Sequence, residues 1–151
     1  LDRTMETAFP LAEAHKLKVV ETPGIGEVQF GTWEGKRLKV LRKRKLWPVV
    51  QHTPSLARFP QGESFPEAQA RAVAELERLR ANHTGKKDAF ACVSHSDVIK
   101  LIVAHYVGLP LDLFQRLHIS PASVTALWVD HHASRLIYLN DMRATQATES
   151  E

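Results

Sequence analysis

Residues 89–108 read Ala89-Phe-Ala-Cys-Val-Ser-His95-Ser-Asp97-Val-Ile-Lys-Leu-Ile-Val-Ala-His-Tyr-Val-Gly108. The apolar run Ala89–Ser94 is rich in strand formers and predicts a short strand. The residues after it predict a helix from Asp97 to Val107 that stops at Gly108. A side chain between a strand end and the next helix start lies where open α/β sheets bind ligands, and the helix start favours an anion. His95 is therefore a candidate phosphate-site residue, and the alternative is a partly buried histidine with a structural role.

The rest of the chain alternates between helical and strand-like patterns. Ser64 and Glu67 form a capping box that predicts a long helix running to Asn82. Strands that alternate with helices predict an α/β fold with a sandwich sheet. The remaining expected elements are a helix over Thr4–Lys16, a short strand at Val19 and Val20, a short helix over Leu111–Leu117, and a hairpin of Ser123–Val129 with Arg135–Leu139.

Composition places the chain among ordinary globular proteins. Its 151 residues are 44% hydrophobic and 25% charged, which suits one domain with a real core. Lys100 and His105 interrupt the longest apolar stretch, so no membrane span and no membrane partner are expected. No signal peptide is visible, and a cytoplasmic location is the default. Cys92 is the single cysteine, which excludes an internal disulfide, and its apolar surroundings predict a buried, inert thiol.

The two ends of the chain differ from its centre. Helical patterning begins almost at once after Leu1, without a methionine or a preceding strand, so we expect an N-terminally truncated domain. The other end is polar and without periodicity, and it predicts a disordered tail. The expected division is therefore a domain over residues 1–141 and a tail over residues 142–151.

Residues 36–45 hold seven basic side chains and no acidic one. Interleaved leucines predict a short amphipathic helix that stops before Pro48. The basic run fits an RNA-binding patch or a funnel for an anionic substrate, but a solvated helix face is the favoured interpretation. The chain's net charge is only +3, so the patch is local. Residues 49–62 have no clear period and read as an insertion or a lid-like segment.

Arg3 and Glu27 could also carry chemistry, whereas Asp97 and the pair His131 and His132 have structural interpretations. Arg3 opens a helix and could hold two phosphate oxygens, although spacing alone favours a solvated charge. Glu27 lies in a glycine-rich loop near aromatic residues that could raise its pKa for general-acid chemistry, whereas in isolation an exposed loop carboxylate is favoured. Asp97 is expected to be the N-cap of its helix. His131 and His132 lack metal-site spacing and are expected to be solvated turn residues.

Taken in order, four segments resemble the histidine phosphatase superfamily, also called the phosphoglycerate mutase-like family. Residues 1–8, Leu-Asp-Arg-Thr-Met-Glu-Thr-Ala, look like the family's Leu-x-Arg-Thr-x-x-Thr-Ala motif. Residues 26–35 look like its Glu-x-x-Phe-Gly-x-Trp-Glu-Gly loop, Gly62-Glu63-Ser64 is similar to its Gly-Glu-Ser, and residues 93–99 are similar to Val-Ser-His-Gly-x-x-Ile. The resemblance covers residues 1 to about 141 and implies a three-layer α/β/α sandwich.

The resemblance also implies a mechanism. Family members transfer a phosphoryl group to a histidine nucleophile and then to water or a second hydroxyl. Arg3 matches the family's second arginine, His95 its second histidine, and Glu27 the acid that protonates the leaving oxygen. Glu63 and Ser64 match a segment near the substrate. No metal or organic cofactor is implied, and the expected partner is a phosphorylated small molecule rather than a nucleic acid.

The chain departs from the family in one respect. The nucleophile belongs to an Arg-His-Gly motif near the family's N-terminus, and no Arg-His-Gly occurs in these residues. We therefore expect the first strand-helix-strand unit to be missing, and the polypeptide alone to be poorly stable or dimer-prone and catalytically inactive. The first-ranked function is a phosphomonoester hydrolase that forms a phosphohistidine when full length. The alternatives are a phosphoglycerate mutase-type transferase, a noncatalytic anion-binding module and, ranked last, a nucleic-acid binder.

Overall fold

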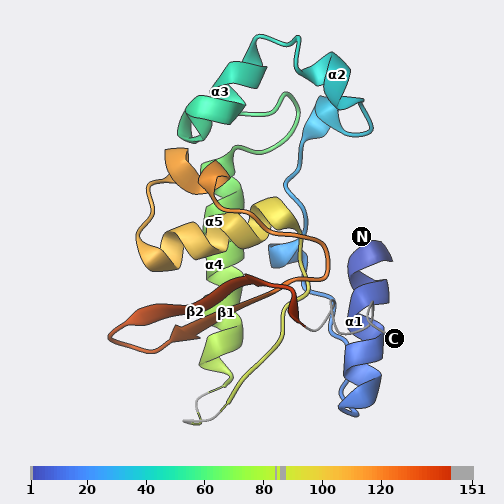
Figure 1. Cartoon of the computed structure of the whole chain (residues 1–151), viewed down its shortest axis with the longest axis vertical. Helices are drawn as coiled ribbons and strands as arrows, with labels where there is room; N and C mark the ends of the chain where they lie inside the picture. Colours follow the sequence, from blue (N-terminus) through green and yellow to red (C-terminus); the bar gives the residue numbers. More distant parts are fainter. Residues whose placement is uncertain (1, 84, 86–87, 144–151) are drawn as a thin grey trace.

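Helix α4 (Phe65–Ala81) and helix α5 (Ser96–Val107) cross at the centre of the fold (Figure 1). The structure is a computed structural model that describes residues 2–83, 85 and 88–143. The other elements are α1 (Asp2–Ala14), η1 (Pro23–Ile25), η2 (Gly31–Trp33), α2 (Leu38–Leu41), α3 (Leu46–His52), η3 (Pro54–Leu56), η4 (Leu111–Arg116), β1 (Val124–Val129) and β2 (Ser134–Asp141).

The N-terminus of α4 is fixed by the predicted capping box. The Ser64 hydroxyl accepts a hydrogen bond from the Glu67 backbone N–H at 3.3 Å, and the Glu67 carboxylate accepts one from the Ser64 backbone N–H at 2.8 Å. These bonds satisfy two backbone donors that the helix start would otherwise leave unpaired. The predicted helix is confirmed, with its last residue at Ala81.

Helix α5 ends as predicted but begins differently. Gly108 adopts the left-handed conformation at φ 70°, which a glycine reaches without steric cost. At the other end His95, and not Asp97, occupies the N-cap position. The predicted N-cap role of Asp97 is wrong, because its carboxylate lies inside the first turn and pairs with Lys100 at 3.0 Å.

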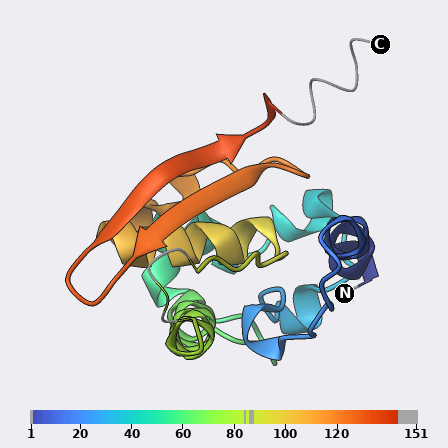
Figure 2. The same ribbon diagram turned by 90° about the horizontal axis from the view of Figure 1, so that it is seen from below.

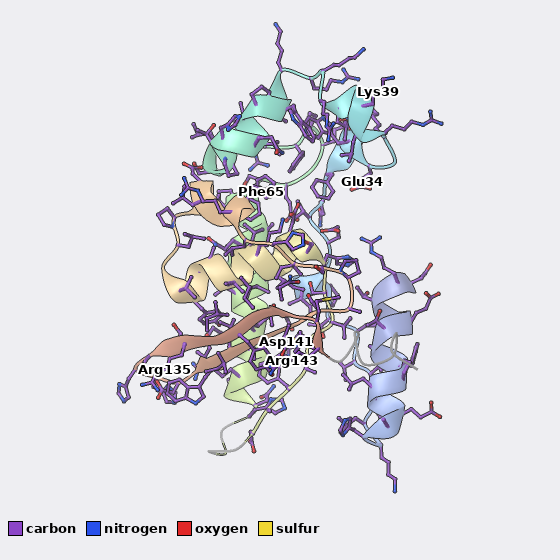
Figure 3. The ribbon with its side chains drawn as sticks, viewed as in Figure 1. Glu34, Lys39, Phe65, Arg135, Asp141 and Arg143 are labelled. Atoms are coloured by element: carbon purple, nitrogen blue, oxygen red, sulfur yellow. The ribbon has the colours of Figure 1, made fainter. Side chains whose placement is uncertain are left out.

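The core lies where α4, α5 and the connecting segments meet. Phe65 at the start of α4 packs against Phe59 and Phe114, with ring centroids 5.4 and 4.9 Å apart (Figure 3). Phe59, together with Val50 and Ala57, comes from residues 49–62 and is buried. The segment therefore contributes to the core, and its interpretation as an insertion or a lid-like segment stays a prediction. These apolar residues have no sequence period because they reach the core from short turns rather than from one helix face.

Strands β1 and β2 form an antiparallel hairpin that lies over α5, with α4 on the opposite side of that helix (Figure 2). The predicted hairpin and the predicted α/β class are confirmed. The strands predicted at Val19–Val20 and Ala89–Ser94 are not formed; within the described part of the chain the only sheet is the hairpin. A strand exists only where a second backbone pairs with it. Cys92 in the unpaired segment is exposed, which corrects its predicted burial.

Helix α1 and the basic segment lie at the margins of the fold (Figure 1). The predicted helix α1 is confirmed, but no described residue of it is buried, and Phe9 is 56% exposed. The helix predicted in residues 36–45 covers only Leu38–Leu41. It ends before Pro48, as predicted, and a separate helix, α3, then begins at Leu46 and contains Pro48. Proline is compatible with a first turn, where its missing N–H would have no helical partner.

Two further expectations concern membrane spans and the C-terminal tail. Among the described residues, no helix has the length and apolar character needed to cross a membrane. The tail predicted over residues 142–151 lies outside the described residues apart from Met142 and Arg143.

Gly31 and Gly35 both have positive φ and offer a matched test of close packing. A Cβ at Gly31 (φ 54°) would lie 2.2 Å from the Pro60 carbonyl oxygen, whereas one at Gly35 (φ 70°) would meet nothing within 4 Å. We expect Gly35→Ala to cost about 1 kcal/mol for its left-handed backbone alone. Gly31→Ala should cost about 2 kcal/mol or more in urea unfolding, because the 59–62 turn must also move. Equal losses in the two variants would contradict this packing.

Candidate active site

Three polar side chains from distant parts of the sequence meet at one place. Arg3 comes from α1, Glu27 from the loop after η1, and His95 from the start of α5. Arg3 Nη2 lies 2.9 Å from His95 Nδ1 and 3.1 Å from Glu27 Oε2. Glu27 Oε2 lies 3.4 Å from His95 Nδ1. The structure therefore brings together the three residues that the sequence nominated for catalysis.

His95 is buried and electrically neutral near neutral pH. Its side chain is only 3% exposed. Burial, followed by the charges of Arg3 and Arg71, lowers the pKa of His95 to about 4. Because a guanidinium can only donate, Nδ1 accepts from Arg3, and the neutral ring carries its proton on Nε2. His95 thus offers an N–H donor without adding charge.

The surroundings of Glu27 shift the pKa of its carboxyl upward. Burial raises the pKa of the Glu27 carboxyl, and the negative charge of Asp97 adds to the effect. The Val28 backbone N–H, which donates to Glu27 Oε1 at 3.1 Å, and the Arg3 guanidinium oppose it. The net direction is upward, which is what a carboxylic acid needs to deliver a proton near neutral pH.

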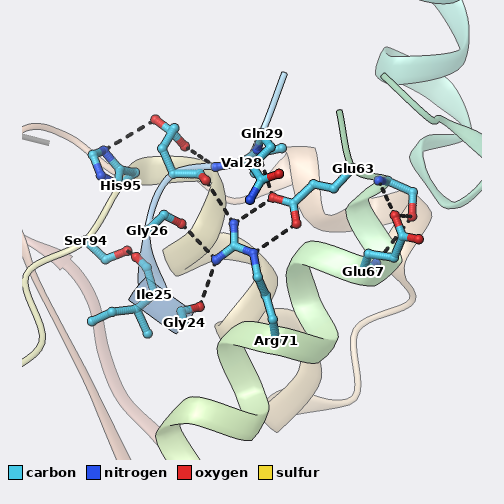
Figure 4. Close-up of polar contacts among 12 residues, drawn as sticks. Gly24, Ile25, Gly26, Val28, Gln29, Glu63, Glu67, Arg71, Ser94 and His95 are labelled. Carbon is cyan, nitrogen blue, oxygen red and sulfur yellow. Dashed lines mark hydrogen bonds and ion pairs between the residues drawn. The ribbon is translucent and has the colours of Figure 1, made fainter. Parts of the chain in front are cut away.

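Arg71 on α4 fixes the loop that carries Glu27, and the sequence reasoning missed it (Figure 4). Its Nε and Nη2 donate to the Glu63 carboxylate at 2.9 and 2.6 Å. Nη1 donates to the carbonyls of Gly24 and Gly26, and Nη2 also donates to the Glu27 carbonyl. All five N–H groups of the guanidinium are used. The sequence feature that could have identified Arg71 is its position beside the buried Ala68 and Ala72, where an arginine interrupts the apolar stripe of α4.

Ser94 joins the same loop to the segment that carries His95. Its hydroxyl donates to the Ile25 carbonyl at 2.7 Å. Arg71 and Ser94 together therefore donate a hydrogen bond to each backbone carbonyl from Gly24 to Glu27. The result is a fixed distance between the Glu27 loop and the start of α5 (Figure 4).

Glu63 and Ser64, nominated as substrate-binding residues, do not join the Arg3–Glu27–His95 cluster. Glu63 is buried against Arg71 and accepts the Gln29 backbone N–H at 2.8 Å. Ser64 caps α4. Both side chains are engaged in structural contacts, and substrate contact by either stays a prediction.

The described residues were also expected to hold no metal. They contain no group of three or more His, Cys, Asp or Glu side chains arranged to hold a metal ion. His131 and His132 are exposed in the turn between β1 and β2, as predicted, and the His132 N–H donates to Asp130 at 2.7 Å.

Two curated proteins are similar over most of this sequence. Phosphoserine phosphatase 1 of Hydrogenobacter thermophilus is 25% identical over 145 residues, which are 93% of this chain and 66% of that protein. A protein named probable phosphoglycerate mutase GpmB, from Yersinia enterocolitica, is 30% identical over 137 residues, which are 89% of this chain and 61% of that protein. This chain therefore spans just under two thirds of the length of these relatives.

Solved structures show the same fold. YhfR of Bacillus stearothermophilus matches with a TM-score of 0.84 at 24% identity, over 92% of this chain and 69% of that one. The complex of mycobacterial glucosyl-3-phosphoglycerate phosphatase with inorganic phosphate matches with a TM-score of 0.77 at 24% identity, over 91% and 72%. The sequence model of the histidine phosphatase superfamily, branch 1, matches residues 1–142. Since that match takes in nearly the whole sequence, this chain belongs to the histidine phosphatase superfamily, branch 1.

Proposed function

We propose that this chain carries the phosphate-binding and acid residues of a phosphomonoester hydrolase whose substrate is a phosphorylated small molecule. The observation that supports it is the convergence of Arg3, Glu27 and His95 within hydrogen-bond and ion-pair distance in a member of this superfamily. Arg3 and the His95 Nε2–H would hold the phosphoryl oxygens, and Glu27 would protonate the leaving oxygen.

The proposed reaction proceeds through a phosphohistidine. A histidine nitrogen attacks phosphorus, the ester P–O bond breaks, and the leaving oxygen takes the proton of Glu27. Water then attacks the phosphohistidine and releases inorganic phosphate. None of the 151 residues is proposed as the attacking histidine, because Arg-His-Gly does not occur among them.

Arg3 donates to Glu27 and His95, and a bound phosphate would compete for the same N–H groups. The Arg3 side chain is 62% exposed, so its guanidinium can turn toward an incoming anion at little cost. Because His95 is neutral, its Nε2–H can donate to phosphate while its Nδ1 still accepts from Arg3. The site therefore combines one cation that can reorient with one neutral donor.

Phosphoglycerate mutase-type transfer is the second candidate, favoured by the similarity to the protein named GpmB. A mutase would move the phosphoryl group between two hydroxyls of phosphoglycerate, whereas a phosphatase would release free phosphate. A noncatalytic anion-binding module would do neither. A cytoplasmic location and a homodimer belong to the same proposal and stay predictions.

Phosphate binding is tested by thermal unfolding of this chain. Orthophosphate at one hundred times its dissociation constant should stabilise the wild type by about 2.7 kcal/mol. Arg3→Met and His95→Asn should each lose most of that protection, because each removes a phosphate ligand. Arg116→Met, which changes an exposed arginine of η4, is the control and should keep it. Full protection in Arg3→Met would exclude the proposed pocket.

The acid role is tested in the native polypeptide as isolated, by release of free phosphate from phosphoserine. Glu27→Gln keeps the size of the side chain but cannot give up a proton, so turnover should fall by about a hundredfold. Orthophosphate protection should persist, because Arg3 and His95 remain. Unchanged turnover in Glu27→Gln would remove the carboxyl from the mechanism.

A further inference from the structure

Positive charge is concentrated in residues 36–45. The chain has 20 Lys and Arg residues and 17 Asp and Glu residues, and seven of the former but none of the latter fall in this segment. The rest of the sequence is therefore net acidic. A local positive field on an otherwise acidic chain attracts anions to one place.

The seven cations of the segment are not neutralised by the rest of the fold. All of them are exposed, and none takes part in the ion pairs found among the described residues. Elsewhere most of the described lysines and arginines form an ion pair. The arginines paired with carboxylates are Arg3, Arg58, Arg71, Arg78, Arg80 and Arg143.

Part of the segment lines an open cleft of about 450 Å³. Its cationic lining residues are Lys36, Lys43, Arg44 and Lys45. The other lining residues are uncharged, and no acidic side chain is among them. The cleft shares no residue with the Arg3–Glu27–His95 cluster. Its segment lies at the end of the molecule that carries α2 and α3, where Lys39 projects outward (Figure 3).

The wall of the cleft is a fixed part of the fold. Trp33, which lines the cleft, is only 8% exposed and stacks on Trp47 with ring centroids 6.2 Å apart. The turn that carries three of the cations is closed by backbone bonds from Arg44 N–H to the Leu41 carbonyl and from Trp47 N–H to the Arg44 carbonyl. The cations therefore extend from an anchored base.

We propose that this cleft binds a compact anion with three or more negative charges, such as a polyphosphate group, independently of the Arg3–His95 pocket. Four cations around one concavity suit several closely spaced phosphates, and the lysines act there as point charges. A single-stranded nucleic acid fits less well, because it needs exposed aromatic faces for base stacking. Here Trp33 is buried against Trp47.

Inorganic tripolyphosphate is the probe, and calorimetric titration at low ionic strength is the measurement. The variant Lys36→Gln, Lys43→Gln, Arg44→Gln, Lys45→Gln should bind tripolyphosphate at least about tenfold more weakly than the wild type. The variant Lys16→Gln, Lys18→Gln, Arg116→Gln, Arg135→Gln loses the same net charge from other exposed sites and is the matched control. It should stay within about threefold of the wild type, because the lost charges lie outside the cleft.

Three results would overturn the proposal. They are unchanged binding in the cleft variant with its melting temperature preserved, equal weakening in the two quadruple variants, and tighter binding of a thymidine oligonucleotide than of tripolyphosphate. Arg3→Met separates this proposal from the phosphatase. That variant should lose protection by orthophosphate but keep its affinity for tripolyphosphate, so either proposal can fail without the other.

Discussion

Replacing Arg71 by methionine is expected to lower the free energy of unfolding by about 3 kcal/mol, measured by urea denaturation. The substitution removes one partner of a largely buried ion pair, and the Arg71 and Glu63 side chains are 24% and 10% exposed. It leaves the Glu63 carboxylate without its cation and the carbonyls of Gly24, Gly26 and Glu27 without their donor. Buried groups left unpaired in this way cost more than the intact pair contributes.

Arg78→Met on the same helix is the matched control. Arg78 pairs with Glu75, but its side chain is 59% exposed, so the loss should be small compared with that of Arg71→Met. Arg71→Lys keeps the charge without the planar fork and should fall between wild type and Arg71→Met. Adding Glu63→Gln to Arg71→Met should restore part of the stability, because the stranded charge is removed. Similar losses in Arg71→Met and Arg78→Met would show that the loop does not depend on the guanidinium.

Local chemistry allowed the best sequence predictions. The capping box of Ser64 and Glu67 and the stop at Gly108 depend on residues a few positions apart, and both are confirmed. The motifs also nominated Arg3, Glu27 and His95, and the structure places these three side chains in contact. Their catalytic roles stay predictions that the substitutions above test.

Features that depend on distant partners could not be read from the sequence. Ala89–Ser94 has the composition of a strand, yet pairing depends on a second backbone and not on composition. Phe59 reaches the core from an aperiodic turn. Arg71 resembles any helix arginine until the carbonyls of residues 24–27 are placed around it. In each case the outcome depends on tertiary contacts with residues that are distant in the sequence.

Acidification is expected to destabilise the protein through His95. The pKa of His95 is lowered from 6.5 to about 4 in the folded state, chiefly by burial and then by Arg3 and Arg71. Between these values the unfolded chain binds the proton and the folded chain does not, so stability falls as the pH falls. The loss begins near pH 6.5, is complete near pH 4 and amounts to about 3 kcal/mol.

Urea denaturation across this pH range, for wild type and His95→Asn, isolates the effect. Glu27, whose pKa is raised, acts in the opposite direction, and the lowered pKa of Glu67 adds a loss below its ordinary value of 4.5. Both carboxyls remain in the variant, so the difference between the two curves reports His95.

Asparagine can still accept from Arg3 but cannot titrate, so the variant should lose the steep fall between pH 6.5 and 4.5. His118→Asn, at an exposed histidine, is the control and should keep it. Parallel curves for wild type and His95→Asn would mean that His95 has its ordinary pKa in the folded state, and that burial does not hold the ring neutral at acidic pH.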